Sequence, residues 1–279
     1  MLSDLIKIKE QIEDKYIKTP IFLPQTPLGV KLKDQILIYN DNKKYKIVPL
    51  NVLLNFPVIF DNYNLSKVDE IGDKTVKITI STCPFTLSSV IYLDEWFPSN
   101  YVYNNNLILI NKDRTVFLIQ NNGESYSLTD GSRLTENNKK LEAKIMTLRD
   151  AITLYPDSVF LHLNINLEYI LTPDYYINNT ILYPIAKTNE KFNKFHPKTL
   201  VFGIEYFSKK NSRKKYSALI GKGSKNNKIY KKSILKNGIE KYLAKMIFKI
   251  REKGGIIIPC FWFAWCTFHP NTNIVDLKT

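Results

Sequence analysis

Alternating apolar and polar positions predict β-structure along much of this chain. Between Thr75 and Ser81 every second residue is apolar, which is the period of a strand with one buried face. Two further strands flank Asn40, Asp41 and Asn42, residue types that favour a tight hairpin turn. Applied to the whole chain, this reasoning predicts strands at 36–39, 45–48, 75–81, 87–93, 107–110, 115–120, 200–207 and 216–220.

Three segments are predicted to be helical instead. Residues 3–17 place apolar side chains on one face of a short amphipathic helix. A second helix is predicted to begin at Thr147, which with Asp150 resembles a capping box, and to end before Pro156. The third covers 238–253, where an apolar face lies beside lysines that recur at every fourth position.

These elements predict an α+β protein that is mainly antiparallel β with a few helices. The chain divides into an N-terminal helix and Pro-rich arm at 1–29 and a first β-rich half at 30–161. A polar connecting region at 162–199 leads to a second half at 200–279, which contains a basic loop and helix.

Short sequence echoes point to two related halves. The tripeptide Lys-Lys-Tyr occurs at 43–45 and again at 214–216. Tyr-Pro-Asp-Ser at 155–158 is matched by His-Pro-Asn-Thr at 269–272. A duplicated β-rich unit would explain both echoes. Chance similarity in a chain rich in Lys and Tyr is the alternative.

The composition is that of a globular protein, with 44% hydrophobic and 24% charged residues over 279 positions. Aromatic residues reach 13%, which favours β-structure. The longest apolar run, 256–268, is broken by Pro259 and is too short to cross a bilayer, so no transmembrane segment is predicted. Three cysteines and a charged N-terminus without a signal peptide predict an intracellular protein or one within a particle.

The excess positive charge is concentrated in one stretch. The chain carries 40 Lys+Arg against 26 Asp+Glu, and the segment 207–253 alone holds 16 basic and two acidic residues. Such local charge predicts an anionic partner. A nucleic acid, an acidic membrane surface and an acidic protein stay open as that partner, and a solvated lysine face without a partner is the alternative. The basic residues expected to bind are Lys209, Lys210, Arg213, Lys214, Lys215, Lys225, Lys228, Lys231, Lys232, Lys241, Lys245 and Lys249.

Candidate catalytic and metal-binding residues are few. Cys83 could act as a nucleophile or as one arm of a Cys-x-x-Cys pair, but the second position of that pair is Thr86. A buried, unreactive thiol is the alternative. Cys260, Cys266 and His269 lie in or beside an apolar run expected to form a core strand, so no metal site, cofactor or catalytic set is predicted.

Four segments resemble one known family. The C-terminal pattern Trp-Phe-Ala-Trp at 262–265 is followed by Phe-His-Pro-Asn-Thr at 268–272. The segments 82–85, 103–114 and 198–205 agree with the same family, in the same order. Together they resemble a prokaryotic domain-of-unknown-function family, thirty-one seventy-nine, over most of the chain. The resemblance implies an architecture and carries no established activity.

The chain departs from that family at Thr86, where a second Cys would stand, and in the loops around 163–196 and 221–237. A copy that lacks the Cys pair looks more like a structural derivative than an active relative. We therefore expect a non-enzymatic structural or binding protein of a larger assembly, with protein partners and a basic face for an anionic one. A virion or other particle fits the abundance of Lys, Asn, Ile and Tyr, which have AT-rich codons. Sequence-independent nucleic-acid binding and a thiol-dependent enzyme using Cys83 are the two alternatives.

Overall fold

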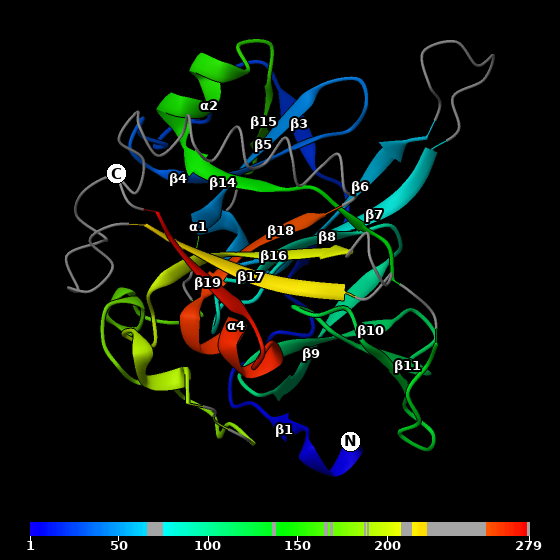
Figure 1. Ribbon diagram of the computed structural model, residues 1–279. Helices are drawn as coiled ribbons and strands as arrows, with labels where there is room; N and C mark the ends of the chain where they lie inside the picture. The colour runs from blue at the N-terminus through cyan, green and yellow to red at the C-terminus, as the bar shows by residue number, and fades with distance from the viewer. Residues whose placement is uncertain are drawn as a thin grey trace.

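Strands dominate the molecule. The computed structural model describes residues 1–65, 75–135, 138–164, 167, 170–186, 188, 190–207, 214–221 and 255–277. Within these residues the strands form four mainly antiparallel sheets, accompanied by short helices (Figure 1). The predicted class, α+β with mainly antiparallel strands and few helices, is confirmed at this level.

Two five-stranded sheets, which we call sheets A and B, contain the strands between residues 58 and 127. Sheet A has the order β1 (Ile6–Lys7), β9 (Trp96–Tyr103), β10 (Asn106–Asn111), β11 (Val116–Ile119), β12 (Ser125–Ser127). Sheet B has the order β13 (Lys140–Leu141), β8 (Ser89–Tyr92), β7 (Thr75–Thr82), β6 (Val58–Asn64), β2 (Tyr16–Ile17).

The other two sheets share one strand order. Sheet C runs β14 (Lys144–Thr147), β4 (Gln35–Asn40), β5 (Tyr45–Pro49), β15 (Val159–His162), with β3 (Ile21–Leu23) added outside β15. Sheet D runs β18 (Ile256–Phe261), β16 (Leu200–Phe207), β17 (Lys214–Gly221), β19 (Asn273–Leu277). In both sheets the first two of these pairings are antiparallel and the third is parallel.

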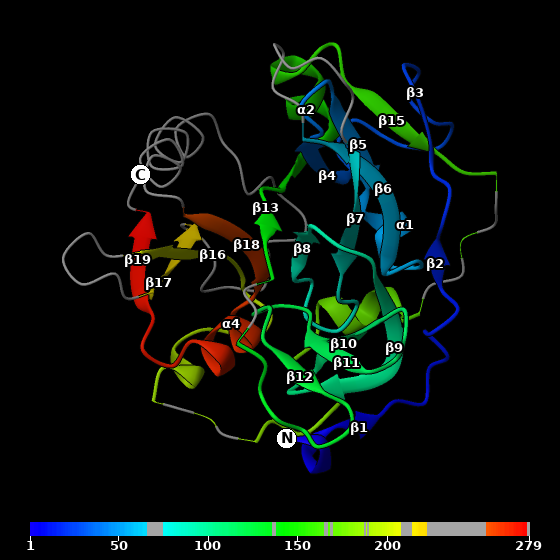
Figure 2. The same ribbon diagram turned by 90° about the vertical axis from the view of Figure 1, so that its right-hand side faces the viewer.

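A short helix connects the outer strands of each of these sheets. Helix α2 (Leu148–Leu154) leads from β14 to β15, and α4 (Trp262–Phe268) leads from β18 to β19. We call β4, β5, β14, α2 and β15 the first unit, and β16, β17, β18, α4 and β19 the second unit. Figure 2 shows the second unit on one side of the molecule and the first unit at the top. Helix α1 (Leu50–Leu53) follows β5 directly.

Local signals in the sequence placed eight of the strands and helix α2, and missed others such as β6 and β9. All eight predicted strands are present, with ends shifted by up to two residues. Helix α2 begins after Thr147, whose hydroxyl accepts a hydrogen bond from the Asp150 backbone N–H at 3.2 Å. In the β4–β5 turn, the Asp41 carboxylate accepts from two following backbone N–H groups, and Asn42 has a φ of 72°. The predicted helix at 238–253 lies outside the described residues.

The predicted helix at 3–17 is wrong. This segment contains the 3-10 helix η1 (Leu2–Asp4) and the short strands β1 and β2. The backbone N–H of Ile8 donates to the Asn100 carbonyl at 2.9 Å, and that of Ile12 donates to the Asn100 side chain at 2.7 Å. Both isoleucines are buried. Long-range pairing with β9 therefore outweighs the weak helical propensity of a short segment.

The apolar run at 256–268 is only partly the core strand that its composition predicts. Strand β18 ends at Phe261, and the Trp-Phe-Ala-Trp motif forms the first turn of α4. Trp262 and Trp265 have no exposed surface and belong to the main core, which joins side chains of sheets A, B and D. A Cβ atom on Gly203 of β16 would lie 2.1 Å from the Trp265 ring. The indole therefore packs directly on the backbone of sheet D.

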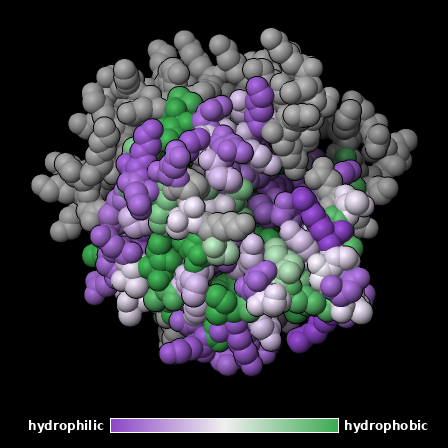
Figure 3. All heavy atoms as spheres, turned by 60° about the horizontal axis from the view of Figure 1, so that its bottom comes forward, coloured by the Kyte–Doolittle hydropathy of each residue, from purple (hydrophilic) through white to green (hydrophobic). Residues whose placement is uncertain are grey.

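The connecting region 162–199 contains the 3-10 helices η2 (Pro173–Tyr176) and η3 (Phe192–Lys194), and no α-helix among its described residues. It packs against the body, since the Tyr175 hydroxyl donates to the Phe85 carbonyl at 2.7 Å. Figure 3 shows a face on which apolar and polar side chains are interspersed. Within the described part of the chain, no helix is long and apolar enough to cross a membrane.

Candidate ligand-binding cleft

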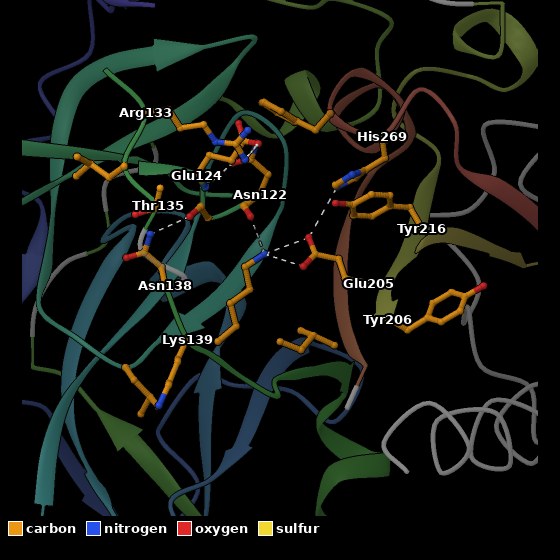
Figure 4. Close-up of a pocket in the computed structure, with 16 residues that line it drawn as sticks. Asn122, Glu124, Arg133, Thr135, Asn138, Lys139, Glu205, Tyr206, Tyr216 and His269 are labelled. Carbon is orange, nitrogen blue, oxygen red and sulfur yellow. Dashed lines mark hydrogen bonds and ion pairs between the residues drawn. The ribbon is translucent and has the colours of Figure 1, made fainter. Parts of the chain in front are cut away.

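A cleft of about 890 Å³ lies between sheet D and the edges of sheets A and B (Figure 4). Asn122 and Glu124 reach it from the connection between β11 and β12, and Lys140 from β13. Glu205 and Tyr216 reach it from β16 and β17. Side chains distant in sequence therefore converge on one concave surface, which is the usual setting of a small-molecule site.

A buried ion pair forms the floor of the cleft. The Lys140 ammonium lies 3.1 and 3.2 Å from the two carboxylate oxygens of Glu205, and the two side chains are 5% and 8% exposed. The same ammonium donates to the carbonyls of Asn121 and Asn122 at 3.2 and 3.0 Å. Buried charges persist only when they are paired and hydrogen-bonded in this way. The pair also links sheet D to sheet B.

His269 borders the carboxylate from the second unit. Its Nε2 lies 3.9 Å from Oε1 of Glu205, and its side chain is buried. The imidazole packs against two aromatic rings, with centroid distances of 4.0 Å to Trp265 and 4.1 Å to Tyr216. The backbone N–H of His269 donates to the Trp265 carbonyl, which fixes this residue at the end of α4.

The Glu205 charge acts on two neighbouring tyrosines. Burial and then the Glu205 carboxylate raise the pKa of Tyr216 above its ordinary value. The same two causes raise the pKa of Tyr92, whose hydroxyl donates to the Gln120 carbonyl at 2.8 Å. Both hydroxyl groups therefore stay protonated at neutral pH, and that of Tyr216 faces the cleft as a neutral polar group.

Among the described residues that line the cleft, the Lys and Arg side chains outnumber the carboxylates by one. Arg133 pairs with Glu124 at 2.6 Å, and Lys140 pairs with Glu205. The exposed Lys139 makes no ion pair with another described residue, so its ammonium is the charge left over. The Arg133 side chain is 64% exposed, and an exposed pair of this kind is weak. Its guanidinium can therefore also serve an incoming anion.

Most of the basic residues predicted to bind an anionic partner cannot be placed. Lys214 and Lys215 begin β17, directly before Tyr216 of the cleft, and Lys215 is exposed. The others lie outside the described residues: Lys209, Lys210, Arg213, Lys225, Lys228, Lys231, Lys232, Lys241, Lys245 and Lys249.

Cys83 lies in the core, away from the cleft. Its side chain has no exposed surface, and the Leu107 backbone N–H donates to its sulfur at 3.2 Å. Burial raises the pKa of the Cys83 thiol, whereas a nucleophilic cysteine needs a lowered pKa. Thr86, three residues after Cys83, joins a buried polar network with Ser88 and Asn106. The geometry around Cys83 therefore favours a structural role.

Cys260 and Cys266 are buried on β18 and α4. Burial also raises the pKa of the Cys260 thiol. Across the described part of the chain, no three His, Cys, Asp or Glu side chains gather in a way that could hold a metal ion.

Reasoning from the sequence missed the cleft. Glu205 is the one acidic residue in the apolar strand Leu200–Phe207, and this was the available signal for it. Nothing in the sequence links it to Lys140, because that contact depends on the packing of two sheets. Comparisons with protein-family models, curated proteins and solved structures found no match to this chain. The resemblance to the domain-of-unknown-function family therefore stays a prediction, and function has to be argued from the cleft.

Proposed function

We propose that this protein is a non-enzymatic binding protein that takes a small anion, such as a phosphate or carboxylate compound, into the cleft. The observation that carries the proposal is the charge distribution. The Lys140–Glu205 pair neutralises the floor, while Lys139 and the weakly paired Arg133 leave the described part of the rim positive. An anion at the rim could pair with the Lys139 ammonium, or with the Arg133 guanidinium in competition with Glu124.

Calorimetric titration with inorganic pyrophosphate at low salt tests this function. We expect binding that Lys139→Ala weakens by about fivefold, the factor expected for one lost charge contact of about 1 kcal/mol. Arg133→Ala should weaken it similarly. Lys33→Ala, which removes an exposed lysine elsewhere, is the matched control and should leave the affinity unchanged. Affinity that neither cleft variant lowers would contradict the proposal. Hydrolysis of pyrophosphate, seen by phosphorus NMR after the titration, would contradict its non-enzymatic part.

A sequence-independent nucleic-acid binder is the second candidate. It is favoured by the 16 basic residues between 207 and 253 and by the exposed Lys215. Binding to labelled mixed-sequence DNA and RNA should then weaken steeply with salt, and charge reversal at Lys241, Lys245 and Lys249 should flatten that dependence. If nucleic acid binds and Lys139→Ala leaves that affinity unchanged, the cleft and the basic segment have separate partners.

We also propose that the protein works as a component of a larger assembly and that its two units arose by duplication. The expectation from composition supports the assembly role, and purification from its native source tests it: a monomer without a partner would contradict it.

What supports the duplication is the shared strand order of sheets C and D and the equivalent helices α2 and α4. The echoes at 43–45 and 214–216 fall at corresponding places, the turn-side ends of β5 and β17.

A further inference from the structure

The two units correspond residue by residue at the ends of their hairpins. Asn40 of β4 pairs with Tyr45 of β5, and Glu205 of β16 pairs with Tyr216 of β17. The strand after the helix is in the same register in each case. Val159 lies beside the residue after Tyr45, and Asn273 lies beside the residue after Tyr216. Asn40 and Glu205 therefore occupy one structural position, and Tyr45 and Tyr216 another.

The helix starts obey the same correspondence. Leu148, the first residue of α2, donates its backbone N–H to the carbonyl that directly precedes β4, at 2.9 Å. Trp262, the first residue of α4, donates to the carbonyl directly before β16, at 2.7 Å. In both units the next helical N–H, from Arg149 or Phe263, donates to the carbonyl two residues earlier, at 2.9 Å. Two sheets that merely shared a strand order would not also be expected to share these individual hydrogen bonds.

The residues after the helices are also equivalent. Tyr155 and His269 both precede a proline and have nearly the same backbone angles, with φ −136°, ψ 68° and φ −130°, ψ 66°. The Tyr155 ring lies 4.0 Å from the Tyr45 ring, as the His269 ring lies 4.1 Å from Tyr216. Each unit thus presents a tyrosine supported by a second ring at the same place.

A second pocket, of about 350 Å³, lies in the first unit at the place that the cleft occupies in the second. Asn40, Tyr45 and Glu142 line this pocket, and their counterparts Glu205, Tyr216 and Ile256 line the cleft. The chemistry differs where the positions match. An amide replaces the Glu205 carboxylate, and Tyr155 replaces the imidazole of His269.

We propose that this pocket of the first unit is a second ligand site, for an uncharged polar ligand with a flat or ring-shaped face. Its two ionisable lining groups of opposite sign, Glu142 and Lys144, leave no net charge to select an ion. Lys144 is held in place by a hydrogen bond of 2.7 Å to the Tyr155 hydroxyl. The inference rests on the proposed relation between the units and not on the anion-binding function of the cleft.

Hydrogen-bonding groups at the pocket are available for such a ligand. The Tyr45 hydroxyl makes no hydrogen bond to another described residue. The Asn40 side chain uses its oxygen to accept from the Asn42 N–H at 2.8 Å, while its NH₂ group has no partner among the described residues. A tyrosine ring with a free hydroxyl beside an amide donor suits a neutral ligand that combines a ring face with hydroxyl or carbonyl groups.

Saturation-transfer NMR with two uncharged probes, glucose and nicotinamide, tests the second site. We expect transfer from the intact protein to at least one probe, and a reduction of at least threefold in Asn40→Ala and in Tyr45→Ala. Because Asn40 is exposed, its variant keeps the fold even if the loss of the Tyr45 ring disturbs the hairpin. Lys33→Ala, at an exposed lysine away from both pockets, should leave this transfer unchanged.

Two results would overturn the second site: no transfer to either probe, or transfer that is undiminished in Asn40→Ala. Pyrophosphate titrations of the same Asn40→Ala protein separate this outcome from the anion proposal. The Lys139→Ala comparison in those titrations reports on the cleft, so the two proposals can fail independently.

Discussion

At the scale of single residues, the Lys140–Glu205 pair is the most consequential contact of the cleft. Because the pair is buried, each charge is stabilised mainly by its partner, and either charge alone would be costly. A lone Glu205→Gln or Lys140→Met substitution should lower the free energy of unfolding by about 3–5 kcal/mol, because it leaves one buried charge uncompensated. The double variant Lys140→Met with Glu205→Gln should recover much of that loss. Urea denaturation measures all three, and a double variant as unstable as the sum of the singles would contradict this account.

Lys198 gives a prediction about pH. Its ammonium donates to the Tyr175 carbonyl and to Asn178, and it lies 3.4 Å from the Tyr175 ring centroid. Burial lowers the pKa of Lys198 to about 8 in the folded protein, from 10.5. Between these values the unfolded chain binds more protons than the folded one, so the contribution of Lys198 to stability rises with pH from about 8 upward.

Unfolding free energies measured at several pH values between 8 and 9.5 test this linkage. The wild type should gain stability with pH relative to Lys198→Met, which removes the titrating group. Lys194→Met, at an exposed lysine nearby, should follow the wild type. If the three proteins have parallel pH profiles, the lowered pKa of Lys198 is refuted.

At the scale of elements, α4 packs closely on β16 because a glycine of the strand faces a tryptophan of the helix. The first unit has the reverse arrangement, with the larger residue on the strand and the smaller one on the helix. Gly203 faces Trp265 in the second unit, whereas the corresponding residues of the first unit are Ile38 and Ala151, which share one core cluster. Gly203→Ala should destabilise strongly, because its Cβ would overlap the buried indole. Trp265→Ala should also destabilise, through the cavity it leaves.

The combination of Gly203→Ala with Trp265→Ala should cost less than the two single changes added together, because the overlap disappears with the indole. Thermal unfolding of the three variants, analysed as a double-mutant cycle, gives the coupling. Strict additivity would show that the Gly203–Trp265 contact does not determine how α4 lies on sheet D.

Eight of the strands and the capped helix α2 could be predicted from the sequence because their signals are local. Period-two alternation, the Asn-Asp-Asn turn and the Thr147 cap act within a few residues. The structure of the N-terminal segment could not be predicted in this way, since the backbone N–H groups of Ile8 and Ile12 bond to Asn100, about ninety positions away. The first turn of α4 was missed for a related reason. A fully buried helix has no polar face, so its periodicity is hidden in an apolar run.

At the scale of the whole molecule, the cleft exists because the second unit packs its hairpin end against sheets A and B. None of Lys140, Glu205 and His269 has a sequence pattern that predicts the other two, so the site could not be derived from local motifs. The short echoes between the halves were the one long-range feature noted in the sequence. The tyrosines of the repeated tripeptide, Tyr45 and Tyr216, line the pockets of the two units. The basic excess pointed to an anionic partner without locating it.

The most direct test of the central proposal is to locate an anion in the crystal. Crystals grown without phosphate or sulfate and soaked in tungstate, an electron-dense divalent anion, would show where anions bind by anomalous scattering. We predict a peak at the cleft, in contact with Lys139, that is lost in crystals of Lys139→Ala. Peaks confined to surfaces outside the cleft would contradict the proposal that this protein binds its anionic ligand between sheet D and the body.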